Sequence, residues 1–224
     1  MILGFDTSTS ATAAGLLLSD GRAFEARADP GPDERPAHAS RLLGLLEQVL
    51  EAGGAGWEEV VRLAVGIGPG GFTGLRIGVA TARGLAQARG LPVVGVGSLH
   101  ALAARAPDVA AVLDARRGEV YAAVWRAGEL TLAPSALTPQ ALVQRLPAGV
   151  RAVGEGAVRF RDVLTVGGAD VPPEAAPEHR LSAVEVCRLA AAADPTPRDA
   201  LEPDYRREPD ATPPPSARRR PPPE

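Results

Sequence analysis

The sequence predicts an α/β protein in which one pattern occurs twice, and two observations carry that prediction. In the first half, apolar runs of strand length alternate with apolar stripes at helical spacing, which is typical of a sheet covered by helices. The opening pattern of apolar strand, aspartate, polar turn and two further strands then returns from residue 109. Asp6 and Asp114 hold the same place in the two copies. We interpret this as a structural duplication, with two unrelated hairpins as the alternative.

The first half has clear local signals for each element. A DG pair at 20–21 is a strong hairpin signal, and Gly53-Gly54 is a typical helix stop. The first helix carries apolar residues at i, i+3, i+4, i+7 and i+8, namely Leu42, Leu45, Leu46, Val49 and Leu50. The expected elements are a strand at 2–6, a hairpin at 12–28, a helix at 39–52, a strand at 60–68, a helix at 74–89, a strand at 91–98 and a short helix at 99–106.

The second half is expected to be smaller. Three strands follow from 109, with a polar turn around Arg116–Gly118, and then a helix at 138–145 and a strand at 150–153. Ser182, with Glu185 three residues later, predicts a capping box that starts a helix at 182–193. The expected domains are 1–106 and 107–207, followed by a tail at 208–224 whose proline and arginine content predicts disorder.

Composition limits the class of protein. The 224 residues are 45% hydrophobic, which is enough for a core, and the net charge of −3 gives no bulk electrostatic case for nucleic-acid binding. Cys187 is the only cysteine, so a disulfide within the chain is excluded, and we expect it in the core. The N-terminus lacks the basic region of a signal peptide, and no run reaches the roughly 20 apolar residues of a membrane span. We therefore expect a cytoplasmic protein.

The segment GIGPGGFTGLRIGVATARGLA, at 66–86, raises the main functional question. Glycines before a helix can direct backbone N–H groups at a phosphate, with Thr73 as N-cap or hydroxyl donor. The segment lacks the Gly-Lys-Ser/Thr of a Walker loop, and the chain has no lysine. The alternative is a tight turn in which glycine lets the helix pack against the sheet.

The sequence DTSTS at 6–10 is the second candidate, because an aspartate at a strand end followed by hydroxyls can hold Mg²⁺ and phosphate. The alternative is a turn whose side chains bond their own backbone. Arg116 and Arg117 after Asp114 could grip phosphate or a partner's carboxylates, or form a solvated hairpin tip. The candidate cofactor-binding residues are Asp6, Thr7, Gly70, Gly71 and Thr73.

Other catalytic patterns are weak. His38, His100 and His179 are far apart and form no paired-ligand motif, so we expect no metal site, and no Gly-x-Ser-x-Gly occurs. His38 is expected at a helix start or an interface. In the helix at 74–89, Gly74, Gly78, Ala82 and Ala86 form a smooth row that is either buried against the sheet or used as a subunit contact.

Four segments together resemble the TsaB (YeaZ) family of tRNA threonylcarbamoyladenosine biosynthesis proteins. They are the glycine segment at 66–86, DTST at 6–9, DARRGEVYAA at 114–123 and PDYRR at 203–207. The resemblance covers most of residues 1–207. One departure is Gly71, where the family usually carries serine.

The resemblance implies an actin/Hsp70/sugar-kinase-like (ASKHA) fold of two RNase H-like subdomains, with mixed sheets flanked by helices. It also implies a non-catalytic subunit for the threonylcarbamoylation of tRNA adenosine-37, which is a homodimer when alone. The implied partners are the catalytic paralogue TsaD, which carries the metal and nucleotide chemistry, and the ATPase TsaE; tRNA is contacted indirectly. The chain itself is expected to hold no cofactor, or at most a weakly bound nucleotide. The expected partner interface comprises His38, Leu42, Leu45, Leu46, Val49, Arg76, Gly78, Val79, Ala82 and Arg83.

Two other classes stay open at this point. A nucleotide-dependent kinase or ATPase would use Asp6 and the turn at 68–74, and a metallopeptidase would need paired metal-ligand histidines that the sequence lacks. The arginines at 218–220 could contact RNA phosphates, although a solubilising tail is the simpler interpretation.

Overall fold

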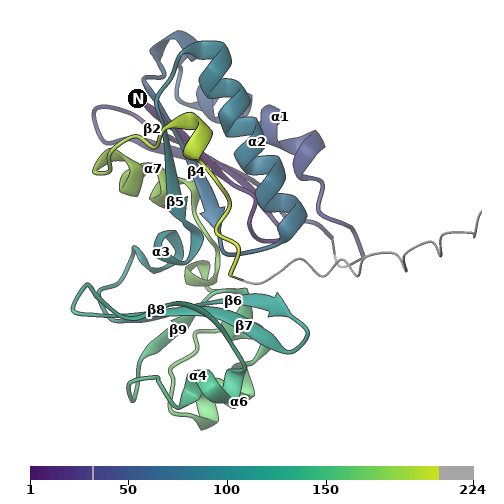
Figure 1. Ribbon diagram of the computed structural model, residues 1–224, viewed down its shortest axis with the longest axis vertical. Coiled ribbons are helices and arrows are strands. Elements are labelled where there is room, and N and C mark those ends of the chain that lie inside the picture. Colours follow the sequence, from purple (N-terminus) through teal and green to yellow (C-terminus); the bar gives the residue numbers. More distant parts are fainter. Residues whose placement is uncertain (32, 207–224) are drawn as a thin grey trace, which may run out of the picture.

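The computed structural model describes residues 1–31 and 33–206, and it contains two sheets, one in the upper and one in the lower half of Figure 1. The tail at 208–224, including the arginines at 218–220, lies outside the described residues. The first sheet has the order β3-β2-β1-β4-β5 and the second the order β8-β7-β6-β9. The strands of the first sheet are β1 Ile2–Asp6, β2 Thr12–Leu17, β3 Ala23–Ala28, β4 Arg62–Gly68 and β5 Val93–Gly97.

The second sheet repeats the topology of the first. In each sheet three consecutive strands pair antiparallel, and the first of them pairs in parallel with the fourth, β1 with β4 and β6 with β9. The predicted duplication is therefore confirmed, while the boundary at 106 and 107 stays a prediction. The strands of the second sheet are β6 Val109–Arg116, β7 Glu119–Arg126, β8 Glu129–Leu137 and β9 Arg151–Val153.

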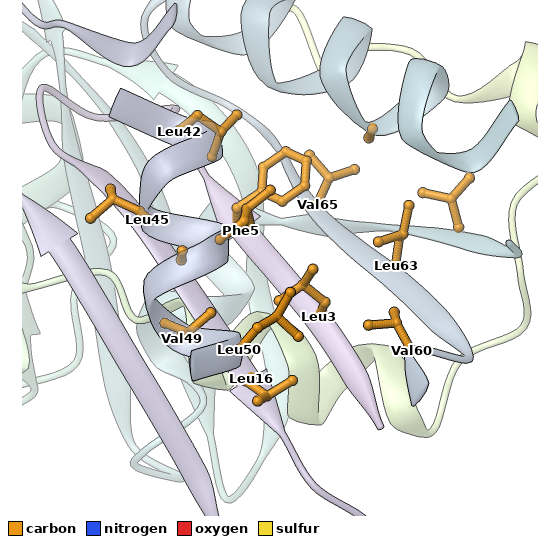
Figure 2. Close-up of a cluster of buried hydrophobic side chains, with 14 of the residues drawn as sticks. Leu3, Phe5, Leu16, Leu42, Leu45, Val49, Leu50, Val60, Leu63 and Val65 are labelled. Carbon is orange, nitrogen blue, oxygen red and sulfur yellow. The ribbon is translucent and has the colours of Figure 1, made fainter. Parts of the chain in front are cut away.

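Two long helices, α1 His38–Ala52 and α2 Phe72–Arg89, lie on one face of the first sheet (Figure 1). Figure 2 shows the apolar side chains of α1 packed over those of β1 and β4. The predicted stripe of α1 is buried, which confirms its helical spacing. The same burial corrects the predicted interface, because Leu42, Leu45, Leu46 and Val49 are at most 8% exposed and cannot contact a partner.

The opposite face of the first sheet is covered by α3 Ser98–Ala103 and α7 Ala183–Ala191. Two glycines let α7 approach the strands closely. A Cβ atom on Gly15 would lie 2.6 Å from the backbone of Ala183, and one on Gly4 would lie 2.5 Å from the sulfur of Cys187. The Glu25 carboxylate on β3 accepts the N–H of Ala183 at 2.5 Å. A helix from the end of the chain therefore completes the first sheet.

The predicted N-cap of α7 is confirmed, since the Ser182 hydroxyl accepts the N–H of Glu185 at 3.4 Å. The reciprocal half of the predicted capping box is not formed, because the Glu185 carboxylate accepts from Arg188. On the second sheet, α4 Pro139–Val143 and α6 Arg161–Val166 lie on the outer side, in the lower part of Figure 1. The helix α5 Glu155–Arg159 packs against β6. The helices α5 and α6 were not predicted, because each is only 5 or 6 residues long and shows no clear periodicity. Three short 3₁₀ turns complete the structure at Trp57–Glu59, Pro177–His179 and Arg198–Ala200.

Cys187 is in the core, as expected, and it donates a hydrogen bond to the Gly15 carbonyl at 3.4 Å. Burial raises the pKa of its thiol far above the usual range, so the reactive thiolate is suppressed. We expect negligible reaction with Ellman's reagent at pH 8 in the native protein and one equivalent in guanidinium. Labelling of the native protein at the rate of a free thiol would contradict this placement.

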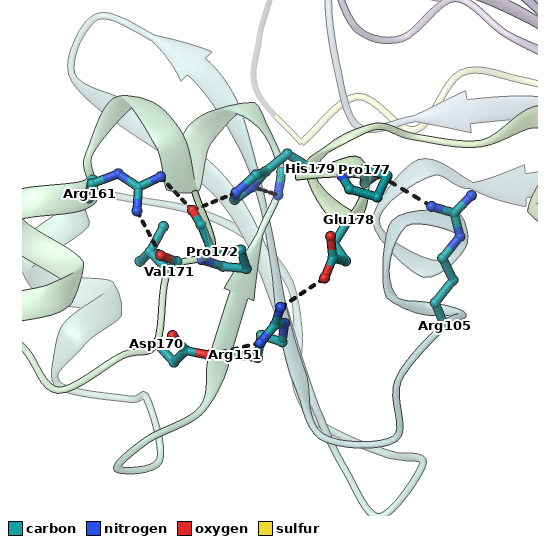
Figure 3. Close-up of polar contacts among 10 residues, drawn as sticks. Arg105, Arg151, Arg161, Asp170, Val171, Pro172, Pro177, Glu178 and His179 are labelled. Atoms are coloured by element: carbon teal, nitrogen blue, oxygen red, sulfur yellow. Dashed lines mark hydrogen bonds and ion pairs between the residues drawn. The ribbon is translucent and has the colours of Figure 1, made fainter. Parts of the chain in front are cut away.

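The segment that returns from β9 to α7 is held by polar contacts (Figure 3). Arg151 on β9 binds Asp170 at 3.0 Å. Nδ1 of His179 accepts the N–H of Gly154 at 3.1 Å, and Nε2 donates to the Pro172 carbonyl at 3.0 Å. Both nitrogens of this buried histidine are used, so His179 has a structural role.

The last described segment runs back along the first sheet. Thr196 forms a bridge to β5, Leu201 is 1% exposed in the core, and the N–H of Asp204 donates to the Ile67 carbonyl at 2.7 Å. Residues 204–206 therefore lie beside the start of α2. No helix in the described part of the chain has a stretch that is both long and apolar enough to cross a bilayer.

Candidate functional site

A cavity of about 690 Å³ lies between the two sheets. It is lined by residues 8–10 after β1, 35–40 at the start of α1, 70–74 at the start of α2 and 204–206 near the C-terminal end of the described chain. Asp114, Arg116, Tyr121 and Glu155 form the wall on the side of the second sheet. The two segments that the sequence singled out, DTSTS and the glycine turn, are thus brought together at one site.

Asp6 does not line this cavity. Its carboxylate accepts the N–H of Ser8 at 2.7 Å, the Ser8 hydroxyl at 2.6 Å and the Ser98 hydroxyl at 2.8 Å, and the residue is 1% exposed. Burial raises the pKa of Asp6, and these hydrogen bonds oppose that rise. The predicted cofactor role of Asp6 stays a prediction, and in this structure both of its carboxylate oxygens accept hydrogen bonds from the protein.

Thr7 is also turned inward. It is fully buried, and its hydroxyl donates to the Gly74 carbonyl at 2.8 Å, so its predicted cofactor role stays a prediction without direct access to the cavity. The glycines of the turn explain this contact. A Cβ atom would overlap Ser8 at Gly70, the Thr7 carbonyl oxygen at Gly74 and the Thr7 hydroxyl at Gly78. The glycine segment therefore packs against the DTSTS loop, as the packing alternative predicted.

The small-residue row of α2 faces its own sheet. Gly78, Val79 and Ala82 are buried there, so their predicted place in a partner interface is wrong. His38 is 5% exposed and lines the cavity instead. Arg76 is exposed, which is compatible with its predicted place in an interface. Its guanidinium lies 3.9 Å from the centroid of the Phe72 ring in the same chain.

The other predicted residues have mixed outcomes. Arg83 is partly exposed and lies 3.7 Å from Asp199. Gly70, Gly71 and Thr73 line the cavity, but the N-cap of α2 is Gly71 and not Thr73. Gly71 gives its own N–H to the Ser8 carbonyl at 2.7 Å. Predicted weak nucleotide binding at this turn stays a prediction.

The second copy of the strand-and-turn pattern forms the opposite wall. The Asp114 carboxylate accepts the Arg116 N–H at 2.9 Å and pairs with Arg159 at 2.9 Å. Arg116 and Arg117 have φ angles of 65° and 52°, a left-handed backbone that is uncommon for arginine. Burial, with the nearby Asp114 charge, raises the pKa of Glu155, a wall residue that the sequence did not single out because it follows an unrecognised helix start.

Within residues 1–31 and 33–206, no three His, Cys, Asp or Glu side chains gather in a way that could hold a metal ion. The paired sheets with a cavity between them define an ASKHA-type fold, whose halves each carry a three-stranded hairpin unit and a parallel fourth strand. In this chain Asp6, the aspartate at the end of the first strand, is buried.

Comparisons with known proteins agree with this class. A family model described as TsaD: tRNA N6-adenosine threonylcarbamoyltransferase matches residues 34–164. YeaZ from Pseudomonas aeruginosa has a similar structure, with a TM-score of 0.72 and 30% identity over 91% of this chain and 98% of that one. Uncharacterized protein Rv3421c of Mycobacterium tuberculosis is 35% identical over 95% of this chain and 94% of its own length.

The tRNA threonylcarbamoyladenosine biosynthesis protein TsaB of Escherichia coli is 38% identical over 134 residues. That match covers 57% of this chain and 56% of the Escherichia coli protein, so it spans about half the length of that relative. The chain belongs to the TsaB (YeaZ) family.

Proposed function

We propose that this chain is a non-catalytic subunit in the formation of threonylcarbamoyladenosine at position 37 of tRNA. In this proposal it pairs with the catalytic paralogue TsaD, is joined by the ATPase TsaE, forms a homodimer when alone and contacts tRNA through the complex. Support comes from the TsaB relatives in Escherichia coli and Haemophilus influenzae, which are tRNA threonylcarbamoyladenosine biosynthesis proteins. The family model for TsaD matches the same chain, which fits a pairing of related folds.

One observation carries the non-catalytic part of the proposal. An aspartate at a strand end followed by hydroxyl side chains can hold Mg²⁺, and Asp6 occupies such a position at the end of β1. Its oxygens are occupied by Ser8 and Ser98 instead. A metal-dependent kinase or ATPase reaction would have to break this buried network first, so the geometry favours a subunit that acts through its surface.

The outward faces of α1 and α2 supply that surface. Gly44 and Gly84 lie inside these helices, yet a Cβ atom on either would meet nothing within 4 Å. An exposed glycine in a helix costs about 1 kcal/mol relative to alanine, so neither glycine is explained by the fold of this chain. With the exposed Leu43 and Ala80 beside them, they form a smooth surface that another helix pair can approach closely. We assign the partner contact to these residues in place of the buried ones.

The test uses Ala80→Arg, which adds a long charged side chain to the exposed side of α2. We expect the wild-type chain to elute as a homodimer and to form a mixed complex with the TsaD paralogue from the same genome. The variant should keep its circular dichroism spectrum and unfold cooperatively as a monomer, but lose both associations. Light scattering after size-exclusion chromatography measures them, and tRNA modification by the reconstituted mixture should fall in parallel.

Ala175→Arg, an exposed loop position in the second half, is the matched control and should associate normally. If the two variants behave alike, the surface assignment fails. If neither the wild type nor the control supports tRNA modification with the paralogue, the proposed function itself fails.

A further inference from the structure

A second cavity, of about 380 Å³, lies beside α3, the helix that contacts strands of both sheets. Trp125 on β7 and Gly128 in the turn before β8 line it from the second half of the chain. Leu189 lines it from α7, which packs on the first sheet. This volume falls within the range of about 300–1,000 Å³ for small-molecule sites. The cavity shares no lining residue with the one described above, so it is a separate place in the fold.

The indole N–H of Trp125 is one sign that this cavity takes a ligand. Trp125 is 9% exposed, and its ring stacks on that of His100 with 5.7 Å between the ring centroids. Buried indole N–H groups usually have an acceptor, but this one has none among residues 1–31 and 33–206. No fully enclosed side-chain nitrogen in those residues lacks a partner, so this nitrogen is open to the cavity that Trp125 lines.

Arg105, in the loop after α3, brings further donors to the same cavity. Its Nη1 donates to the Pro177 carbonyl at 3.4 Å (Figure 3), and its Nε lies 3.6 Å from the Glu185 carboxylate. Both contacts are long, and its Nη2 has no acceptor in the described part of the chain. Arginine and the indole N–H are donors only, so the group that they bind must be an acceptor. A carboxylate suits an arginine in particular, because its two oxygens match the guanidinium.

The charged groups around the cavity leave it positive. Glu185 pairs with Arg188 at 2.7 Å and also lies near Arg105, so two arginines share one carboxylate. Asp108, at the end of the same loop, pairs at 3.7 Å with an arginine at the end of β7. Burial lowers the pKa of His100, so its ring is neutral at pH 7 and adds no charge. One negative charge from a ligand therefore balances the second arginine.

The rest of the lining is mostly apolar, with side chains from Ala103, Ala104, Ala106, Pro107 and Leu189. Two backbone carbonyl groups of this wall are already used. Ala103 accepts the N–H of Ala106 at 3.1 Å, and Pro107 accepts the N–H of Gly128 at 3.0 Å. The cavity thus combines side-chain donors that lack acceptors with an apolar surface, which fits a ligand that has one anionic group and an apolar body.

We propose that this cavity binds a small carboxylate with an apolar body, such as an aromatic acid. The Trp125 indole N–H and the Arg105 guanidinium bind the carboxylate, and the alanines, Pro107 and Leu189 contact the apolar body. The site belongs to this chain alone, and it does not depend on the proposed function in tRNA modification.

The test is a titration of the full chain with benzoate at constant ionic strength, followed by NMR of the indole N–H groups. The chain has two tryptophans, and Trp57 packs on the core of the first sheet, outside this cavity. We expect a saturable shift of the Trp125 indole resonance, an unmoved Trp57 resonance and a benzoate-dependent rise in unfolding temperature. Absence of a saturable Trp125 shift with both benzoate and hexanoate overturns the proposal, and so do equal shifts of both tryptophans.

Two further probes each carry one part of the proposed ligand. Acetate has the carboxylate without the apolar body, and benzyl alcohol has the ring without the charge. Each should bind at least about tenfold more weakly than benzoate. Acetate binding as tightly as benzoate would show an anion effect only, and benzyl alcohol binding as tightly would show apolar filling only. Either result overturns the proposed ligand class.

Arg105→Gln is the decisive variant, with Arg188→Gln as its matched control. Each removes one of the two arginines beside Glu185 and changes the net charge equally, but only Arg105 lines the cavity. The two side chains are 40% and 53% exposed, so both variants should fold. Benzoate affinity should fall about tenfold in Arg105→Gln and less than about twofold in Arg188→Gln. Equal losses would indicate net charge alone and would overturn the proposal.

Trp125→Phe tests the indole donor. Phenylalanine keeps a ring to stack on His100 but has no N–H, so benzoate affinity, followed by the Gly128 amide shift, should fall about fivefold or more. A folded variant with unchanged affinity would contradict the role of the indole. Ala104→Phe fills the cavity from an exposed position and should abolish binding even if the Trp125 variant is unstable. Normal binding in Ala104→Phe would place benzoate elsewhere and overturn the assignment.

Discussion

Gly74→Ala is expected to destabilise the protein by at least about 2 kcal/mol, the largest effect of any single-methyl change considered in this chain. The added Cβ atom would overlap the backbone carbonyl oxygen of Thr7, which cannot rotate away as a side chain could. Because Thr7 also binds the Gly74 carbonyl through its hydroxyl, the two segments are held together from both sides. Urea unfolding followed by circular dichroism measures the change in the free energy of unfolding.

Gly84→Ala is the matched control on the same helix. Nothing lies within 4 Å of a Cβ atom there, and the backbone is helical, so alanine should stabilise the monomer by about 0.5–1 kcal/mol through its helix propensity. The two variants should therefore move in opposite directions. Equal destabilisation of both would show that α2 does not pack on the DTSTS loop as described.

Asp6→Ala is expected to cost about 2–4 kcal/mol of stability, because it leaves the Ser8 N–H, the Ser8 hydroxyl and the Ser98 hydroxyl without their acceptor in the core. Thermal and urea unfolding measure the loss. If Asp6 were instead a metal ligand in an open site, the alanine variant would fold normally and lose only nucleotide-dependent activity. A stability unchanged from wild type would therefore contradict the buried network.

Asp6→Asn separates the hydrogen bonds from the charge. Burial raises the pKa of Asp6 in the folded state, so the folded state binds this proton more tightly than the unfolded state does. The resulting stability is present below the unfolded pKa of about 3.9 and is lost as the pH rises through the folded pKa. The free energy of unfolding of wild type minus that of the asparagine variant should therefore fall as the pH rises from about 4 toward 7. A difference independent of pH would contradict the raised pKa.

The regular elements could be predicted because their signals are local. The leucine stripe of α1, the DG hairpin and the Ser182 cap each depend on a few neighbouring residues, and all three are present in the structure. The short helices at 155–166 could not be predicted in the same way. They follow Gly154, which has a φ of 110° and lies against the Val112 backbone of β6, and they pack on the second sheet through contacts that are distant in the sequence.

The site was harder to predict because spacing alone does not say which way a residue faces. The row of Gly74, Gly78 and Ala82 could pack equally well against the sheet or against a partner. The contacts of Gly74 and Gly78 with Thr7 show that the row packs inside this chain. Asp6 has the sequence context of a ligand, yet Ser98, far away in sequence, completes its burial. The sequence did contain one sign of which side of α2 faces solvent. Gly84 lies opposite the buried residues of this helix, where the fold itself does not require a glycine.

The position of α7 in the sequence determines when the first sheet can be completed during translation. At about 5–20 residues per second, the strands of the first sheet emerge well before Ala183–Ala191 is made, and one face of that sheet stays bare until then. The absence of side chains at Gly4 and Gly15 leaves the space that this helix occupies. The first sheet, built from the first half of the sequence, is therefore completed only after a helix from the second half has been made.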